Sequence, residues 1–428
     1  MASRNNNRHR RKPKPPAARR ALEITRLGRQ GDGIAETETG PVYVPGALAG
    51  ERVEAEVRGD RGRLLDVIVP APERVTPPCP HFGTCGGCQV QHLADAAYRD
   101  WKRGLVVTAL SNRGLDGAVA PLVDAHGAGR RRVTLHARFS GRQVRIGFMP
   151  ARSHELLEVG ECPVLASDLD AAFAAATRLA AVFAGRAGKL DLAFTATETG
   201  LDAAIRGAGA PDLDRRMDLA DAAGELDLAR VSVDGETISE RRQPVLTMGP
   251  ARVVVPAGGF LQATAAGEAA LSRMVLETCA DAATAADLFC GVGPFALGLA
   301  PARPVDAFDS DTAALAALEH AVRFTPGLKP LKVTRRDLFE RPLLPDELRR
   351  YAAVVFDPPR AGAEAQAREL AESTVPTVVG VSCEPATFAR DAAILVAGGY
   401  ELERVTPIDQ FRHTGHVEMV GVFRKPSA

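Results

Sequence analysis

The sequence predicts a multidomain protein that joins a small all-β OB-like barrel, a central α+β domain and a C-terminal doubly wound α/β domain. The chain starts with short alternating strands between turn residues, continues with mixed strand and helix patterns, and alternates strands with helices from about residue 251. The predicted parts are a basic disordered tail at 1–21, the barrel at 22–72, the central domain at 73–250 and the α/β domain at 251–428.

The composition is that of a soluble globular chain. It has 428 residues, of which 46% are hydrophobic and 25% are charged. No apolar run reaches the length of about 20 residues that a membrane span needs, and the first residues lack the apolar stretch of a signal peptide. We therefore expect a cytoplasmic, monomeric protein that does not contact membranes.

Charge is distributed unevenly along the chain. The first 22 residues hold eight Arg or Lys and no acid, which leaves 45 basic against 53 acidic residues in the remainder. Such an arm is attracted to nucleic-acid phosphates without needing a fixed structure. A tail that only improves solubility explains it equally well.

The segment 22–69 has the pattern of a small barrel. Apolar and polar residues alternate in short runs that Gly-Asp, Gly-Pro and Pro-Gly interrupt. This favours about five strands in an OB-like arrangement. Barrels of this kind often bind RNA, although the fold alone does not establish it.

Cysteines are concentrated in the segment "CPHFGTCGGCQVQHL". Cys79, Cys85 and Cys88 lie within ten residues, and Cys162 in "GECPV" is a candidate fourth ligand. In a chain without an export signal, such spacing indicates metal or redox chemistry more than structural disulfides. Four thiolates can hold a tetrahedral zinc ion or an iron–sulfur cluster, and the spacing does not distinguish the two. Residues 104–250, which include most of the central domain, contain no recognisable catalytic group of residues.

The α/β domain begins with a glycine loop. Its first strand ends in "DLFCGVGPF", where Gly291 and Gly293 allow a ligand to approach the backbone at a helix N-terminus. Asp309 ends the second strand, 18 residues after Gly291, and is suited to accept hydrogen bonds from ribose hydroxyls. The loop also satisfies a loose dinucleotide-binding pattern, so a nicotinamide-dependent dehydrogenase remains possible at this point.

Later strands add reactive groups to the same predicted edge. Asp357 follows one strand in "FDPPRAG", Cys383 follows the next in "VSCEPATF", and Glu418 lies beside the last strand. In an open parallel sheet, ligands bind beyond the carboxyl ends of the strands. We therefore expect these side chains to meet in one site.

Taken in order, these segments resemble the RNA uracil-5-methyltransferases that use S-adenosylmethionine, in the cluster-bearing branch with an N-terminal TRAM barrel. The resemblance spans residues 22–428. It rests on "CPHFGTCGGC" with "GECPV", "FLQAT", "DLFCGVGPF", "FDPPRAG", "VSCEPATFARD" and "FRHTGHVE".

The resemblance implies a role for each candidate residue. Cys383 would be the nucleophile and Glu418 the base that removes a proton. The S-adenosylmethionine site would include Gln262, Phe289, Asp309 and Asp357, and a [4Fe–4S] cluster would be held by Cys79, Cys85, Cys88 and Cys162.

The chemistry of uracil requires such groups. Uracil C5 is a weak nucleophile, so a thiolate first adds to C6 and makes C5 reactive toward a methyl donor. A carboxylate then removes the remaining C5 proton, and elimination releases the thiol. Phe260 could stack on a nearby base, or it could be an ordinary core residue.

Four residues depart from the family pattern, and two of them, Pro294 and Asp337, replace common Asn-like choices in the cofactor-side loops. Asp309 stands where the family more often has Glu, and Glu384 stands after the nucleophile where Asn is usual. An acid beside Cys383 would raise the pKa of the thiol if the two groups were close.

The function predicted from the sequence is methylation of C5 of a uridine in large-subunit ribosomal RNA. Transfer RNA is the alternative substrate within the family. A dehydrogenase would use the glycine loop but not Cys383, Glu418 or the cysteine group, and a non-catalytic RNA-binding iron–sulfur protein would not need the residues at the sheet edge.

Overall fold

The computed structural model describes residues 17–116, 118–151, 153, 155–185 and 188–426, and the chain forms two compact units. The first unit runs to Pro77 and includes Gln89–Tyr98, whereas the second comprises Pro78–Cys88 and the chain from Arg99 onward. Among the described helices, none combines the length and the hydropathy that a membrane crossing requires.

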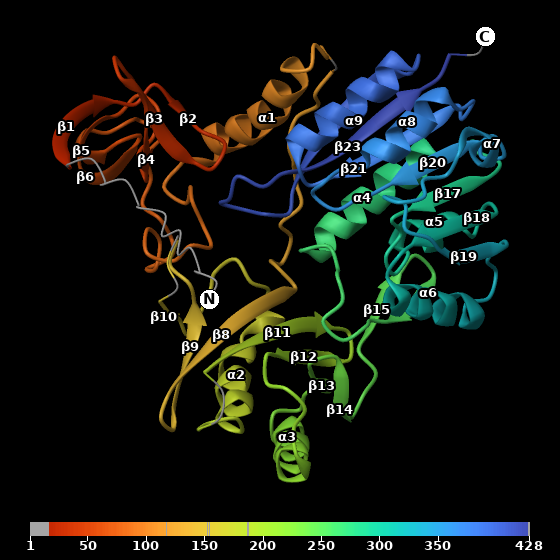
Figure 1. Ribbon diagram of the computed structural model, residues 1–428, viewed down its shortest axis with the longest axis horizontal. Coiled ribbons are helices and arrows are strands. Elements are labelled where there is room, and N and C mark those ends of the chain that lie inside the picture. The colour runs from red at the N-terminus through yellow and green to blue at the C-terminus, as the bar shows by residue number, and fades with distance from the viewer. Residues whose placement is uncertain (1–16, 117, 152, 154, 186–187, 427–428) are drawn as a thin grey trace, which may run out of the picture. The chain divides into compact units, whose positions relative to one another are not determined.

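The first unit is built on a six-stranded sheet, shown in red to orange in Figure 1. Pairing is antiparallel except between β4 and β6, and inward-facing aliphatic residues of these strands form the core. The predicted all-β architecture is confirmed, with six strands where we expected about five. The strands, in the order β1-β5-β6-β4-β3-β2, are β1 (Ala18–Glu23), β2 (Arg26–Leu27), β3 (Asp32–Thr37), β4 (Gly40–Pro45), β5 (Arg52–Arg58) and β6 (Arg61–Val69).

The first strand begins earlier than the sequence pattern indicates. Strand β1 pairs with β5 from Ala18 to Glu23, so residues 18–21 belong to the six-stranded sheet and not to the basic tail. Arg19 and Arg20 are exposed on this strand, and one residue of the six, Leu22, is buried, which explains why no alternation was visible. Residues 1–16 of the predicted tail lie outside the described part of the chain.

The middle of the second unit is an α+β arrangement, as predicted. A seven-stranded sheet and the helices α2 and α3 share one hydrophobic core (Figure 1). The sheet has the order β10-β9-β8-β11-β12-β13-β14. The elements are β8 (Arg132–Ser140), β9 (Gln143–Phe148), β10 (Leu157–Glu158), a 3-10 turn η1 (Ser167–Leu169), α2 (Ala172–Ala181), β11 (Lys189–Thr197), β12 (Gly200–Arg206), α3 (Leu213–Glu225), β13 (Arg230–Val233) and β14 (Glu236–Glu240).

The C-terminal part is a doubly wound sheet. After a hairpin, five parallel strands lie in the order β19-β18-β17-β20-β21, and β23 joins β21 antiparallel. The elements are β15 (Val245–Met248), β16 (Ala251–Val254), α4 (Ala265–Thr278), β17 (Ala285–Leu288), α5 (Pro294–Leu299), β18 (Val305–Asp309), α6 (Thr312–Phe324), β19 (Leu331–Arg335), α7 (Pro345–Leu348), β20 (Ala353–Phe356), α8 (Glu364–Glu372), β21 (Thr377–Ser382), α9 (Pro385–Ala397), β22 (Glu401–Asp409) and β23 (Glu418–Arg424).

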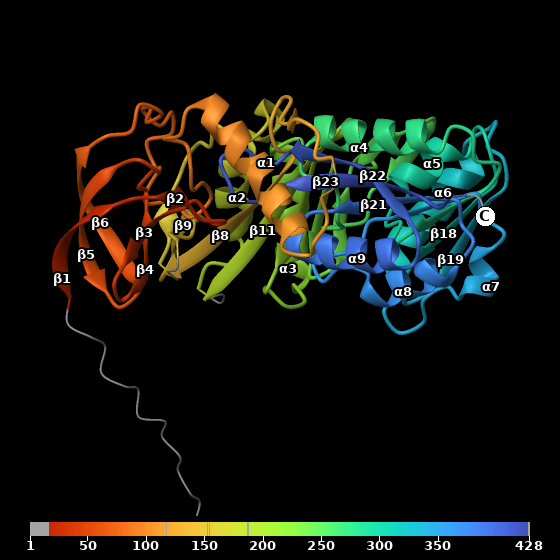
Figure 2. The same ribbon diagram turned by 90° about the horizontal axis from the view of Figure 1, so that it is seen from above.

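Helices cover both faces of this sheet, as Figure 2 shows. One core contains residues of α4, α5 and α6, and the other contains residues of α7, α8 and α9. Neighbouring strand residues alternate between the two cores: Ala285 faces one and Ala286 faces the other. Burial on both faces explains why the strands read as continuous apolar runs.

A segment from the predicted central domain belongs to this sheet. The two-residue strand β7 (Val123–Asp124) pairs with β22, and α1 (Asp95–Ser111) contributes Val106 and Leu110 to the core beneath α9. The boundary predicted at residue 250 between the central domain and the α/β domain therefore does not hold for α1 and β7. A two-residue strand carries no pattern that a sequence reading can detect, yet it covers part of the otherwise exposed edge of β22.

A buried ion pair stabilises the seven-stranded sheet. Arg230 donates to both carboxylate oxygens of Asp202, at 2.8 and 2.9 Å, and to the carbonyl oxygen of Val255 at 2.8 Å. Replacing Asp202 with Ala removes the close carboxylate from the buried guanidinium and leaves the Val255 carbonyl and the more distant Glu240 carboxylate, at 3.9 Å. We expect Asp202→Ala to lower the free energy of unfolding by about 3–5 kcal/mol, measured by urea denaturation.

The matched control is the exposed pair between Arg216 and Glu236. Because water solvates both partners, Glu236→Ala should barely change the denaturation midpoint. If Asp202→Ala and Glu236→Ala lowered the free energy of unfolding equally, burial would not explain the stability that the Arg230 pair provides.

Candidate active site

Strand register brings the predicted catalytic residues together. Strand β23 runs antiparallel to β21, and Ser382 pairs with Met419. Continuing this register by one position places Cys383, the residue that follows β21, opposite Glu418, which begins β23. Strand β20 lies on the other side of β21 and leads directly to Asp357, so all three groups meet at the carboxyl ends of the parallel strands.

The carboxyl groups of Asp357 and Glu418 lie where ionisation costs free energy. Glu418 is buried, and burial together with the charge of Asp357 raises its pKa above the ordinary range. Burial also raises the pKa of Asp357, which the hydrogen bond from Gln262 opposes. Each group thus favours its neutral form more than a surface carboxyl would.

The thiol is likewise held in its protonated form. Burial, followed by the charges of Glu418 and Asp357, raises the pKa of Cys383 to about 11. Arg360 opposes this shift through its charge and a hydrogen bond to the thiol. Glu384 caps helix α9, where its carboxylate accepts a hydrogen bond from the Ala386 N–H at 3.4 Å.

A chain of side-chain amides connects the carboxyl groups. Gln262 donates to Asp357 at 3.1 Å, and Gln410 donates to Gln262 at 2.7 Å and to Glu418 at 2.8 Å. Gln262 and Gln410 are both buried. The chain therefore runs without interruption from one carboxyl to the other.

The glycine loop is held by two aspartates. Asp309 accepts hydrogen bonds from the N–H groups of Gly291, at 2.8 Å, and Asp311, at 2.8 Å. Asp287 is fully buried and accepts from the Ala296 N–H at 2.9 Å, while its second carboxylate oxygen has no partner among the described residues. Asp287 thus holds the first turn of α5 with one oxygen and leaves the other as a buried polar atom without a partner among the described residues.

The backbone of the loop leaves room for a ligand. Gly291 has φ of 54°, and a side chain added there would meet nothing within 4 Å. Phe289 also adopts a positive φ, 61°, and its ring lies 5.4 Å from that of Phe339. A non-glycine residue in this conformation is strained, and such strain is concentrated at functional sites.

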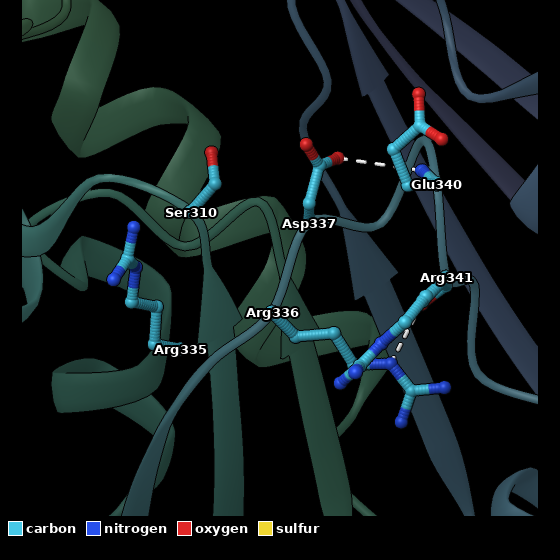
Figure 3. A pocket seen from close by; sticks show the side chains of 6 residues that line it. All are labelled: Ser310, Arg335, Arg336, Asp337, Glu340 and Arg341. Carbon is cyan, nitrogen blue, oxygen red and sulfur yellow. Dashed lines mark hydrogen bonds between the residues drawn. The ribbon is translucent and has the colours of Figure 1, made fainter.

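A cavity lies next to Asp309. It measures about 390 Å³, its lining includes Ser310 directly after β18 and Arg335 at the end of β19, and Figure 3 shows the side chains that line it. Both acidic and basic side chains line it. The lining residues are Ser310, Arg335, Arg336, Asp337, Glu340 and Arg341.

The four predicted cluster cysteines all lie in the second unit and are partly buried. Burial raises the pKa of Cys162, and the charges of Cys85 and Cys79 raise it further. The Gly87 N–H donates to the sulfur of Cys85 at 3.4 Å. Within the described ranges, however, no three His, Cys, Asp or Glu side chains are arranged as metal ligands.

Two functional candidates escaped the sequence analysis. Arg360 contacts the thiol of Cys383, and its place directly after Asp-Pro-Pro could have indicated this. Gln410 follows Asp409 at the end of β22, where no motif identified it. Phe260 is 74% exposed, so the alternative of a core phenylalanine is wrong.

Known proteins resemble this chain over almost its whole length. Residues 19–66 match the TRAM domain, and residues 336–426 match the tRNA (uracil-5-)-methyltransferase family. An RNA methyltransferase of Brucella suis is 48% identical over 94% of this chain and 97% of its own. The 23S rRNA (uracil(1939)-C(5))-methyltransferase of Halomonas elongata is 35% identical over 96% of this chain and 90% of its own.

The chain belongs to the RNA (uracil-5-)-methyltransferase family. The TRAM region and the enzyme class predicted from the sequence are confirmed. The tRNA (uracil-54, C5)-methyltransferase of Pyrococcus abyssi, with a TM-score of 0.71 at 20% identity over 94% of this chain and 100% of its own, has the same fold. A dehydrogenase and a non-catalytic RNA-binding protein are therefore set aside.

The electrostatics of this methyltransferase site predict how Cys383 reacts with alkylating agents. Because the pKa of the thiol is raised to about 11, its alkylation by iodoacetamide should be slow at neutral pH and should accelerate up to that range. Glu418→Gln removes a charge that raises this pKa, so the variant should react faster at pH near 9. Peptide mass spectrometry separates Cys383 from the other cysteines.

Glu384→Gln is the matched control for this measurement. It removes a carboxylate that is adjacent in sequence but caps α9. An equal acceleration in the two variants would show that Glu418 does not act on the thiol specifically.

Proposed function

We propose that this enzyme transfers a methyl group from S-adenosylmethionine to C5 of a uridine in large-subunit ribosomal RNA. The observation that carries the proposal is the placement of Cys383 opposite Glu418 at the carboxyl end of the sheet. One side chain supplies a nucleophile and the other a base, which are the two groups that methylation of uracil C5 requires.

The reaction proceeds through covalent attachment to Cys383. Once the thiol has lost its proton, the thiolate adds to C6, and the electron pair of the C5–C6 double bond is displaced and makes C5 nucleophilic. After C5 takes the methyl group, Glu418 removes the C5 proton, the double bond forms again, and the sulfur leaves C6. Arg360 assists the first step because its positive charge favours the thiolate over the thiol.

The residues of the glycine loop fit the methyl donor. S-adenosylmethionine supplies a methyl group on a positively charged sulfur. The open space beside Gly291 and the unpaired oxygen of Asp287 are suited to such a ligand. Gln262, Phe289, Asp309 and Asp357 would hold it, as the family resemblance implies, and the crystal structure of the Pyrococcus abyssi enzyme is a complex with S-adenosyl-L-homocysteine.

The choice of ribosomal RNA is supported by the full-length relative from Halomonas elongata, which is named for a ribosomal uridine. Transfer RNA is the second candidate, favoured by the family that matches residues 336–426 and by the fold of the Pyrococcus abyssi enzyme. The exposed ring of Phe260, near Gln262 in sequence, is available to stack on an RNA base in either case.

Mapping of 5-methyluridine tests the reaction and the substrate together. Ribosomal and transfer RNA are taken from cells lacking the gene and from cells rescued with the wild-type chain or with Cys383→Ala. We expect one ribosomal uridine to lose its methyl group and only the wild type to restore it. Loss confined to transfer RNA would exclude the ribosomal substrate, and rescue by Cys383→Ala would exclude the covalent mechanism.

We also propose that Cys79, Cys85, Cys88 and Cys162 hold a [4Fe–4S] cluster. Four thiols in one unit are the ligand set of such a cluster. The N–H donated to the sulfur of Cys85 would stabilise a thiolate there. Methylation of uracil by this route transfers no electrons, so the cluster would support the fold or orient the RNA.

Metal analysis tests this second proposal. Protein purified without oxygen should contain iron and inorganic sulfide at about four atoms each per chain. Cys162→Ser should lose most of both, whereas Cys279→Ser, which replaces a buried cysteine of the core, should keep them. Stoichiometric zinc in place of iron would contradict the cluster.

A further inference from the structure

The side chain of Gln410 uses both of its amide N–H groups and its oxygen in hydrogen bonds. Its amide nitrogen donates to Gln262 at 2.7 Å and to Glu418 at 2.8 Å. Its amide oxygen accepts from the backbone N–H of Thr264 at 3.4 Å. Because a backbone N–H can only donate, this contact determines which end of the amide is oxygen, and both N–H groups must therefore point to acceptors.

The backbone around Gln410 is anchored on both sides. Asp409 forms a buried ion pair with Lys102 of α1, and its carboxylate accepts from the Phe411 N–H at 3.0 Å. Lys102 also donates to the carbonyl oxygen of Phe411 at 3.0 Å. The residues that precede and follow Gln410 are thus held by the same buried lysine.

We propose that Gln410 is a positioning residue for proton abstraction: its amide holds Oε2 of Glu418 as a hydrogen-bond acceptor and leaves Oε1 to receive the C5 proton. This inference rests on the proposed function. In the step itself, the electrons of the C5–H bond form the C5–C6 double bond, the bond between C6 and the Cys383 sulfur breaks with its electron pair leaving on the sulfur as a thiolate, and the proton ends on Oε1.

The hydrogen bond favours the form of Glu418 that can accept a proton. An N–H donated to a carboxylate is stronger than one donated to a neutral carboxyl group. The other groups that face Glu418 are Asp357 and Arg360 from the loop after β20, and Cys383 after β21. Asp357 opposes ionisation, and Arg360 and Gln410 favour it, so loss of the amide should raise the pKa of Glu418.

Two near-isosteric substitutions separate this role from simple space filling. Gln410→Met keeps an unbranched side chain but removes both donors. Gln410→Glu keeps the shape and adds a carboxyl group beside Glu418. The matched control is Gln366→Met, because Gln366 is equally buried and makes two hydrogen bonds to Leu343, away from the site.

The experiment is a single turnover with methyl-labelled S-adenosylmethionine and total RNA from cells lacking the gene. Quenching in denaturant separates methylated RNA still attached to Cys383 from free methylated RNA. As a reference, Glu418→Gln should retain the label in the attached form, because the C5 proton cannot be removed.

We expect Gln410→Met to release the methylated RNA about tenfold more slowly than wild type, while label still enters the RNA at the normal rate. The pH at which release becomes half-maximal should move upward, because a higher pKa of Glu418 leaves less carboxylate at a given pH. Gln410→Glu should retain more attached RNA than Gln410→Met, and Gln366→Met should release it like wild type.

Two results would overturn the role of Gln410 without affecting the proposed function. Wild-type release and pH dependence in both Gln410 variants would show that the amide does not act on Glu418. Equal slowing of labelling and release, with an unchanged pH dependence, would show a purely structural role. If Glu418→Gln itself retains no attached RNA, the proposed roles of Cys383 and Glu418 fall, and the role of Gln410 falls with them.

Discussion

The repulsion between two buried carboxyl groups is the interaction on which the rest of the site depends. Asp357 and Glu418 lie close enough for the charge of one to raise the pKa of the other. Burying such a pair is costly unless hydrogen bonds or cations compensate. The amide chain through Gln262 and Gln410 supplies donors to both carboxyls, and Arg360 supplies the nearby positive charge.

The direction of β23 makes this pairing possible. A sixth parallel strand after β21 would begin at the amino end of the sheet, far from Cys383. Because β23 runs antiparallel, its first residue lies at the edge where β21 ends, and Glu418 can face the thiol. The adjoining strand β22 ends at the same edge, which puts Gln410 within reach of Glu418.

Much of this arrangement could be predicted from the sequence, and the limits have physical causes. Apolar runs identified the parallel strands, and the polar residue after each run identified Asp357 and Cys383. The contribution of α1 and β7 to the same sheet was not predictable, because it depends on contacts between residues about 300 positions apart, such as Lys102 with Asp409. Gln410 was missed for a related reason: its importance follows from strand register, and an isolated glutamine has no sequence signature.

The electrostatics also constrain the order in which charges can exist in the site. Burial disfavours a thiolate at Cys383, and the charge of an ionised Glu418 disfavours it further. In the proposed mechanism the sulfur becomes an uncharged thioether once it bonds to C6, so it no longer opposes ionisation of Glu418. Arg360 and Gln410 favour the negatively charged form of Glu418. This form is needed only after the bond between the Cys383 sulfur and C6 has formed. The repulsion between a Cys383 thiolate and an ionised Glu418 is therefore absent when the base has to act.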